Sequence, residues 1–249
     1  MGRPRVLLVD DDASIRRFVA MALEDMAVEL VEAAGVPQAR EALRGAPFQL
    51  IITDLMMPGE TGFDLLQHLA DHPAQRGDAR LAVFSAGIRA ETLARLDALG
   101  VWRHLPKPTS LTELEQCVRD AVGAAPAAAV VPAPAAAAGL TDAERAALAR
   151  HFGGDEALFL AYRASCLAQF ANDQRAGDAA LAQHDAAALR RLAHSLKSVL
   201  ATLGHDGAST IAKQLEDRAA QADWAAAPPL WQALRAALEG NSPHHPTPK

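Results

Sequence analysis

Acidic residues and one lysine stand where apolar runs of the chain give way to turns. Asp10, Asp11 and Asp12 directly follow the run VLLV, and Asp54 follows the run LIIT. Lys107 lies in the segment LPKP, at the end of another apolar run. Carboxylates gathered in one place repel one another unless a cation lies among them, and their oxygens suit an octahedral Mg²⁺. If the fold brings these residues together, they offer metal-assisted phosphoryl transfer, in which a lysine neutralises a phosphoryl oxygen.

Five short apolar runs alternate with helix-like stretches over the first half of the chain. The expected strands cover residues 6–9, 28–32, 50–53, 81–85 and 101–105. The expected helices cover residues 14–25, 37–44, 62–70, 90–99 and 111–122. This alternation predicts a doubly wound α/β fold with a five-stranded parallel sheet. Ligands bind at the carboxyl edge of such a sheet. Asp10, Asp11, Asp54 and Lys107 are therefore expected to meet there, with Ser85 at the end of the fourth strand.

Each of these features has an ordinary explanation when it is taken alone. Acidic triplets are usually solvated turns, a serine at a strand end is usually a turn residue, and a Lys-Pro pair is common. Their occurrence together at the ends of four strands is what favours a phosphoryl-transfer site.

The motifs VLLVDDD, ITDLMMPGETG, VFSAG and LPKP resemble those of the response-regulator receiver family, whose sheet is flavodoxin-like. The resemblance covers residues 5 to about 122. It implies that Asp54 is the phosphoacceptor and that Asp10, Asp11, Asp54 and the carbonyl of Met56 hold Mg²⁺. Such a domain catalyses its own phosphorylation and dephosphorylation, and Asp12 has no part in this scheme.

The same resemblance implies two features of the switch. Ser85 would reorient toward the phosphoryl group, and the bond from Lys107 to Pro108 would be cis. His104 stands three residues before Lys107, where many receivers carry an aromatic switch residue. His104 is either a switch or a half-exposed strand residue without a signalling role, and we favour the second interpretation.

The second half of the chain differs in pattern from the first. Residues 123–139, GAAPAAAVVPAPAAAAG, carry no charge, and their three prolines forbid one continuous helix. This composition predicts an extended linker that follows a first domain over residues 1–122. Residues 140–240 show helical spacing without strand-like alternation, which predicts an all-α helical bundle. The polar tail over residues 241–249 is expected to be disordered.

One histidine in this second half stands out by its neighbours. An apolar stripe at helical spacing runs from Leu189 to Leu203, and His194 projects opposite that stripe, toward solvent or a partner. Most exposed histidines have no function. A nucleophilic histidine needs an accessible nitrogen, nearby cations and small neighbours, and HSLKS offers all three.

The run LAHSLKSVLATLG resembles the histidine-containing phosphotransfer (Hpt) family, over residues 140 to about 239. The resemblance implies that His194 carries a phosphoryl group and that Lys197, one turn later, stabilises the phosphate. Ser198 stands where glycine is usual, which slightly narrows the approach of a partner.

Composition and charge exclude several other classes of protein. The formal net charge is -6 and the chain has no basic block, which argues against a nucleic-acid partner or an anionic membrane surface. No stretch approaches the roughly 20 apolar residues of a membrane span. Two cysteines outside any metal-binding spacing are expected to be reduced thiols. We therefore expect a cytoplasmic protein.

These observations favour a phosphorelay protein of a two-component system that is not itself a kinase, because no ATP-binding kinase motif is present. Its partners would be an upstream histidine kinase, most plausibly a hybrid one, or a phosphotransfer protein, and a downstream receiver. A homodimer through the receiver is left open. The alternative is an interaction module that phosphorylation of Asp54 regulates and in which His194 carries no phosphate.

Overall fold

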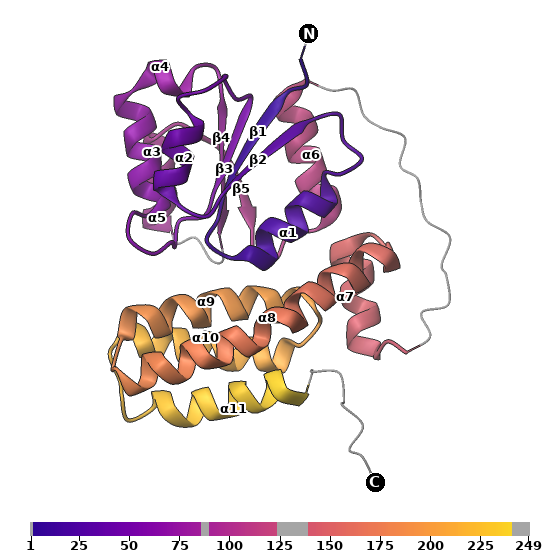
Figure 1. Cartoon of the computed structure of the whole chain (residues 1–249), viewed down its shortest axis with the longest axis vertical. Coiled ribbons are helices and arrows are strands. Elements are labelled where there is room, and N and C mark those ends of the chain that lie inside the picture. Colours follow the sequence, from indigo (N-terminus) through magenta and orange to yellow (C-terminus); the bar gives the residue numbers. More distant parts are fainter. Residues whose placement is uncertain (1, 86–89, 124–138, 241–249) are drawn as a thin grey trace.

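The computed structural model describes residues 2–85, 90–123 and 139–240. The predicted linker, apart from its two end residues, and the whole predicted tail lie outside the described residues. The chain forms an α/β half and an all-helical half that pack against each other (Figure 1). Among the described residues, no helix combines the length and the apolar character needed to cross a membrane.

The first half contains one parallel sheet with the strand order β2-β1-β3-β4-β5. Its strands are β1 (Arg5–Val9), β2 (Glu29–Ala33), β3 (Leu50–Thr53), β4 (Arg80–Ser85) and β5 (Val101–Pro106). The central strands β1 and β3 are almost entirely buried because helices cover both faces of the sheet. The predicted doubly wound, five-stranded parallel sheet is confirmed.

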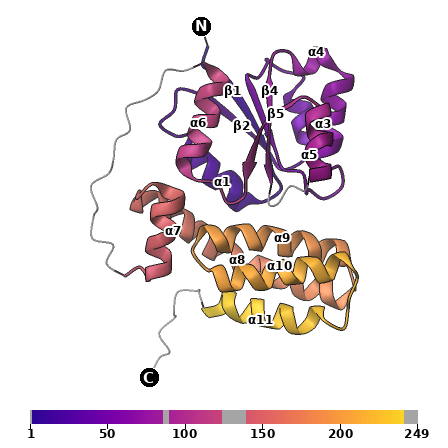
Figure 2. The ribbon, with the colours of Figure 1, turned by 180° about the vertical axis from the view of Figure 1, so that it is seen from behind.

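Six helices accompany this sheet within the described parts of residues 2–123. They are α1 (Ala13–Ala22), α2 (Val36–Ala42), α3 (Gly62–Asp71), α4 (Pro73–Arg76), α5 (Ala90–Ala98) and α6 (Leu111–Val122). Alternate side chains of each strand point to opposite faces, so Leu8 and Ile52 pack with α1 and α6, while Leu7 and Ile51 pack with α2, α3 and α5. Figures 1 and 2 show the two helical layers on either side of the sheet.

One helix prediction in this half needs correction, and one helix was not predicted. The helix expected over residues 14–25 ends at Ala22, because the chain turns from Leu23 onward, where Met26 N–H bonds to the Leu23 carbonyl. The short helix α4 was not predicted. It begins at Pro73, a residue suited to the first turn of a helix, but it is too short to leave a periodic apolar pattern.

The second half is all helical, as predicted. Its helices are α7 (Asp142–Phe152), α8 (Glu156–Ala182), α9 (Ala186–Thr202), α10 (Asp206–Ala220) and α11 (Ala227–Gly240). Helices α8 to α11 form a closed bundle in which α8 and α10 each contact both α9 and α11. Gly177 allows α8 to approach α11, because a Cβ there would lie 2.1 Å from the Trp231 ring. Asp155 and Asp185 cap α8 and α9 with their side chains.

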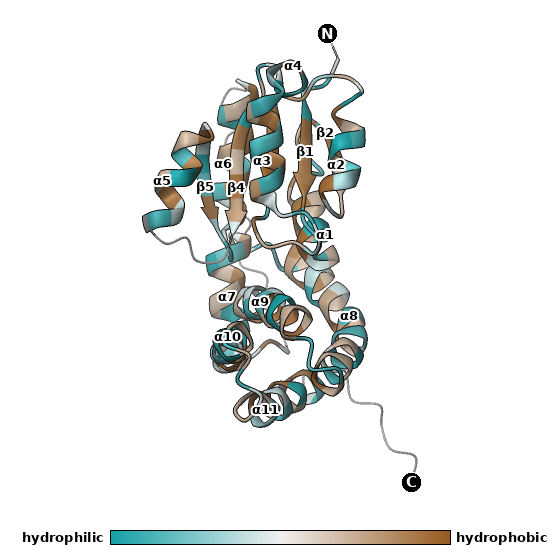
Figure 3. Cartoon of the chain, turned by 90° about the vertical axis from the view of Figure 1, so that its left-hand side faces the viewer, coloured by the Kyte–Doolittle hydropathy of each residue, from teal (hydrophilic) through white to brown (hydrophobic). Residues whose placement is uncertain are grey.

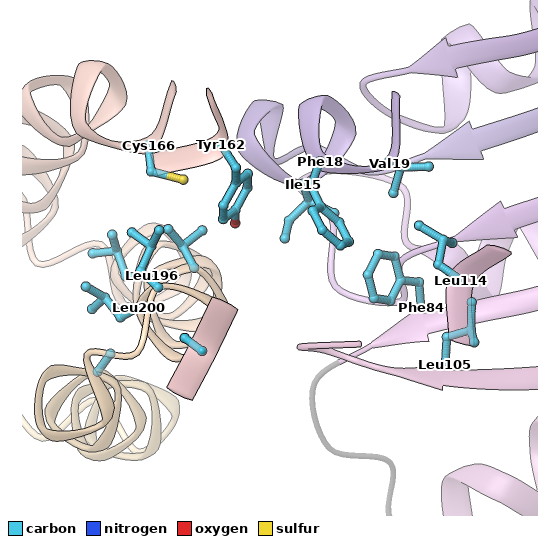
Figure 4. Packing of buried hydrophobic residues seen from close by; sticks show 14 of the residues in the cluster. Ile15, Phe18, Val19, Phe84, Leu105, Leu114, Tyr162, Cys166, Leu196 and Leu200 are labelled. Atoms are coloured by element: carbon cyan, nitrogen blue, oxygen red, sulfur yellow. The ribbon is translucent and has the colours of Figure 1, made fainter. Parts of the chain in front are cut away.

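The two halves share a continuous apolar core. Helix α1 of the sheet half contacts α8 of the bundle, and α6 contacts α7. The Phe18 ring packs edge-on against Phe152 at 5.6 Å and against Tyr162 at 5.5 Å between ring centroids. Figure 4 shows Tyr162 beside Ile15 and Phe18 of α1. In Figure 3 the bundle lies below the sheet, with α9 on the side where the strands end.

Candidate functional site

A cluster of carboxylates lies at the carboxyl edge of the sheet, where the sequence placed it. Asp10 and Asp11 follow β1 and Asp54 follows β3, and one oxygen from each lies within 4.8 Å of the others. Asp10 and Asp54 are buried, whereas Asp11 is exposed. The structure therefore brings together three of the four predicted metal ligands as an oxygen donor set of the kind that suits a hard divalent cation.

Backbone groups hold the two buried carboxylates in place. Asp12 N–H donates to Asp10 Oδ1 at 2.9 Å, and Met56 N–H donates to Asp54 Oδ1 at 3.2 Å. The loop after Asp54 folds back so tightly that a Cβ at Gly62 would lie 1.9 Å from the Asp54 carbonyl oxygen. Glycine is therefore required at position 62 for the loop to close over Asp54.

Lys107 reaches the same cluster from the end of β5. Its Nζ donates to Asp10 Oδ2 at 2.5 Å and to Asp54 Oδ2 at 2.8 Å, and the ammonium is buried with its partners. Its backbone N–H donates to the Ser85 carbonyl at 3.1 Å. The peptide bond from Lys107 to Pro108 is cis, as the receiver resemblance implied.

The site carries more negative charge than Lys107 neutralises. Burial raises the pKa of Asp10, Lys107 opposes this, and the carboxylates of Asp54 and Asp12 add to the rise, so that the pKa lies at about 7. Burial and the Asp54 charge also raise the pKa of Asp11. Burial alone would lower the pKa of Lys107, but the two carboxylates beside it raise that pKa above its usual value. An added cation at this position would relieve the repulsion.

The remaining predicted residues of the receiver half lie near this cluster or on β5. Ser85 is buried at the end of β4, beside Pro106 of β5. Met56 lines the same narrow cavity as Asp54 and Lys107. His104 is half-buried on β5, as the favoured interpretation expected, and its Nε2 atom is buried without a hydrogen-bond partner. Whether Ser85 or His104 acts as a switch stays a prediction.

His194 is held by a residue that the sequence analysis did not identify. Its Nδ1 atom lies 2.7 Å from Oε1 of Glu216 on α10, and Oε2 of Glu216 accepts a hydrogen bond from Lys197 Nζ at 2.6 Å. Burial by itself would raise the pKa of Glu216, but the hydrogen bonds from His194 and Lys197 lower it to about 2. Glu216 is therefore a carboxylate that fixes both predicted residues of α9.

The expectation of an exposed basic face around His194 is wrong. His194 is 5% exposed and Ser198 is 2% exposed, because α9 lies against the carboxyl edge of the sheet. Ser195 Oγ donates to Asp12 Oδ2, which joins the two halves beside the site. The partner that His194 faces is thus the receiver-like half of its own chain.

His194 and Asp54 line one narrow cavity, together with Asp11, Met56, Lys107 and Ser195. The Nε2 atom of His194 is buried and has no hydrogen-bond partner. Arg191, which the sequence analysis did not single out, also lines this cavity. Lys197 does not line it, because its ammonium group is bound to Glu216.

Asp12, which has no part in the predicted metal site, has a structural role that was not predicted. Its side chain caps α1 by accepting from the backbone N–H groups of Ser14 and Ile15, and it accepts from Ser195. The sequence DDDAS, with an acidic residue before a helical stretch, was the available signal for the cap. The contact with Ser195 could not be found from sequence, because the two residues are 183 positions apart.

Asp173 gives a pH-dependent prediction for the contact between the halves. It lines a cavity of about 160 Å³ with Asp11, Asp12 and Ser195, and burial together with the Asp12 charge raises its pKa to about 6. Between pH 4 and pH 6 the Asp173 carboxyl is therefore protonated in the folded state but charged in the unfolded state. The charged carboxylate lowers the free energy of unfolding, and this loss of stability is fully present above pH 6 and vanishes toward pH 4. Asp173→Asn should raise the free energy of unfolding at pH 8 by about 1 kcal/mol, a value reduced for partial exposure.

Urea unfolding of Asp173→Asn and of the wild type at pH 8 and pH 4 tests this expectation. Asp25→Asn, at an exposed position, is the matched control and should change neither value. An equal gain from Asp173→Asn at both pH values would contradict the electrostatic origin of the effect.

Comparisons with known proteins agree with this division of the chain. The family model for the response regulator receiver domain matches residues 6–119, and that for the Hpt domain matches residues 161–240. The response regulator protein PilR of Pseudomonas aeruginosa is 30% identical over 122 residues, which are 49% of this chain and 27% of PilR. The DNA-binding transcriptional regulator NtrC of Azospirillum brasilense is 31% identical over 135 residues, which are 54% of this chain and 27% of NtrC.

The chain thus spans about a quarter of the length of these two relatives. Among solved structures, a response regulator receiver protein from Pseudomonas putida is 32% identical with a TM-score of 0.45, over 48% of this chain and 98% of that chain. The two family matches lie side by side in the sequence without overlap. Residues 6–119 are therefore a response regulator receiver domain and residues 161–240 are an Hpt domain, joined in one chain.

Proposed function

We propose that this chain is an intermediate of a two-component phosphorelay in which Asp54 accepts a phosphoryl group. The observation that carries the proposal is the position of Asp54, which is buried 2.8 Å from the Lys107 ammonium and grouped with Asp10 and Asp11. Phosphoryl transfer spreads negative charge over the phosphoryl oxygens, so positioning and cations supply most of the catalysis. A receiver domain together with an Hpt domain supports the same assignment.

Each residue of the carboxylate cluster has its own part in the proposed phosphoryl transfer. The Asp54 carboxylate attacks the phosphorus atom of the donor's phosphohistidine, the N–P bond of the donor breaks, and its imidazole leaves with the electron pair. Lys107 neutralises an oxygen of the transferred group. Asp10, Asp11, Asp54 and the Met56 carbonyl would hold Mg²⁺, which supplies further neutralisation of the phosphoryl oxygens when bound. Ser85 would donate its hydroxyl hydrogen to the phosphoryl group, and a movement of Ser85 would report the modification.

In the Hpt domain, His194 would accept or donate the phosphoryl group through Nε2. Its Nδ1 atom faces the Glu216 carboxylate, which favours the tautomer with the proton on Nδ1 and a free lone pair on Nε2. Lys197 supports the site by holding Glu216, and would reach the phosphate after the group has transferred.

The partners follow from this chemistry. A histidine kinase of the hybrid type or another phosphotransfer protein would supply the group, and a downstream receiver would remove it. No nucleic-acid or membrane partner is part of the proposal. A cytoplasmic location fits Cys117 and Cys166, which are free thiols in the structure.

Transfer of labelled phosphate from a histidine kinase to wild type, Asp54→Asn and His194→Gln tests the proposal. We expect base-labile label on Asp54 in His194→Gln, and base-stable label on His194 only when a phosphorylated receiver domain acts as donor. No label on Asp54 with any donor would overturn the assignment of the receiver. A bundle that stays unlabelled in every direction would replace the relay with an interaction module that phosphorylation of Asp54 regulates.

A further inference from the structure

The contact between the two domains combines buried aromatic packing with a side-chain hydrogen bond, as specific interfaces do. The edge-on ring pairs of Phe18 with Phe152 and Tyr162 form part of this contact, and all three side chains are buried. Such ring pairs stabilise a contact beyond the effect of the area that they bury. The hydrogen bond from Ser195 to Asp12 lies at the edge of the contact, next to the carboxylate cluster. The interface therefore fixes α9 against the carboxyl edge of the sheet.

This contact places the two phosphoacceptor residues face to face. Asp54, Lys107 and His194 line one cavity of about 10 Å³ between the domains. The His194 ring has one nitrogen bound to Glu216, and its other nitrogen is buried and unpaired. A buried imidazole nitrogen without a partner is costly unless the site is made for a reacting group.

We propose that the receiver and Hpt domains of one chain are each other's partners, and that the phosphoryl group passes between Asp54 and His194 within that chain. The inference rests on the proposed function and names the partner that the sequence left open. The aromatic contact holds the domains in the transferring arrangement. In that arrangement α9, with His194 and Ser195, covers Asp54 against donors from outside.

The transfer step needs no additional reactant. Starting from phosphorylated Asp54, the Nε2 lone pair of neutral His194 forms an N–P bond while the acyl O–P bond breaks, and the electron pair leaves with the Asp54 carboxylate. The proton on Nδ1 stays in its hydrogen bond to Glu216, which balances the positive charge of the phosphorylated ring. Lys107 balances the Asp54 carboxylate that is released. The reverse step follows the same path.

The small size of the cavity has two consequences. A volume of about 10 Å³ is at the lower limit for a single water molecule, so hydrolysis of the phosphoryl group is suppressed in the docked arrangement. So narrow a cavity also leaves no room for an outside donor beside Asp54, so phosphorylation of Asp54 by such a donor requires the domains to separate. Docking should therefore slow the phosphorylation of Asp54 and speed the transfer to His194.

The test measures whether transfer depends on protein concentration. The full chain is phosphorylated on Asp54 with labelled acetyl phosphate and Mg²⁺ and freed of donor, and base-stable label on His194 is followed over time. A mixture of phosphorylated His194→Gln chain with Asp54→Asn chain reports transfer between chains. We expect a rate in the wild type that does not change with concentration and that exceeds the rate of a micromolar mixture by roughly 10² to 10³, as a millimolar effective concentration gives.

The outcomes separate the inference from the proposed function. A wild-type rate that rises in proportion to concentration and equals that of the mixture overturns transfer within the chain but leaves the relay intact. Base-stable label in neither sample overturns the relay, and with it the inference.

Ser195→Glu tests the docked arrangement directly, because it places a carboxylate against Asp12 and beside Asp11. Transfer within the chain should fall at least about tenfold through like-charge repulsion, while acetyl phosphate should modify Asp54 faster. Damage to His194 alone would not speed that modification. Ala187→Glu, at an exposed position on the same helix, is the matched control and should behave as wild type. Unchanged rates of both steps in Ser195→Glu would overturn the docked arrangement.

Discussion

Lys107→Met should remove most phosphoryl transfer to Asp54 and destabilise the receiver domain at the same time. Lys107 is the buried ammonium that pairs with Asp10 and Asp54. Removing one well-placed group that stabilises transition-state charge typically lowers a rate by about 10² to 10³. Leaving buried carboxylates without their cation typically costs about 3 kcal/mol or more of unfolding free energy. Transfer from acetyl phosphate and urea unfolding measure the two effects.

The loss of stability in this variant should depend on pH. The pKa of Asp10 in the folded wild type is about 7, above its value of 3.8 in the unfolded chain, so its burial lowers stability as pH rises from 4 to 7. Without Lys107 that pKa rises further, and the penalty keeps growing above pH 7. The destabilisation by Lys107→Met should therefore be larger at pH 8 than at pH 6.

Two controls make this prediction specific. Lys213→Met removes an exposed lysine of the bundle and should change neither transfer nor stability. Added Mg²⁺ should restore part of the stability of Lys107→Met, because a cation bound by Asp10 and Asp11 would replace the missing charge. A destabilisation that is equal at pH 6 and pH 8 and insensitive to Mg²⁺ would mean that packing, rather than charge, is what Lys107 contributes.

The receiver half was predictable because its chemistry is tied to strand ends. Apolar runs that are buried on both faces mark the strands, and in a parallel sheet the residues that follow those strands meet at one edge. Asp10, Asp54 and Lys107 were placed together on this basis alone. The periodicity of α9 likewise identified its core-facing stripe. In both cases the signal is local in sequence.

The features of the site that could not be predicted depend on packing between segments that are distant in sequence. Glu216 meets His194 only because α10 packs against α9, and its position beside Leu215 has no distinguishing pattern. His194 appeared exposed because helical periodicity describes one helix and its own core, not a second domain that covers the other face. The aromatic residue Phe18 could be assigned to a core, but not to one shared with Tyr162 of the other domain.

Glu216→Ala should slow phosphorylation of His194 by at least about 10- to 100-fold, the range typical for loss of a carboxylate that orients a metal-binding histidine. Glu216 touches no reacting atom, so it is a positioning residue. It accepts from Nδ1 and thereby leaves the lone pair on Nε2 for phosphorus. Without it, the other tautomer, with its proton on Nε2, becomes populated and cannot attack. Single-turnover transfer from a phosphorylated receiver measures the rate.

A spectroscopic readout separates this positioning role from simple loss of structure. The ¹⁵N shifts of His194 should show protonated Nδ1 in the wild type and a mixture of tautomers in Glu216→Ala. Glu216→Gln keeps an acceptor oxygen for Nδ1–H but loses the charge that holds Lys197, so its rate should lie between those of wild type and Glu216→Ala. Asp217→Ala, at the exposed neighbouring position, is the matched control. A wild-type tautomer in Glu216→Ala would contradict the assignment.

The stability of the bundle should respond to Glu216 in a defined pH window. The pKa of Glu216 is about 2 in the folded chain and 4.5 in the unfolded chain, so its contribution is fully present above pH 4.5 and is lost as pH falls through 2. A difference of this size corresponds to at most about 3 kcal/mol of unfolding free energy. Glu216→Ala should thus be clearly destabilised at pH 7 and nearly equal to wild type at pH 2. If the difference persists at pH 2, then packing of the side chain, rather than its charge, joins α10 to the histidine on α9.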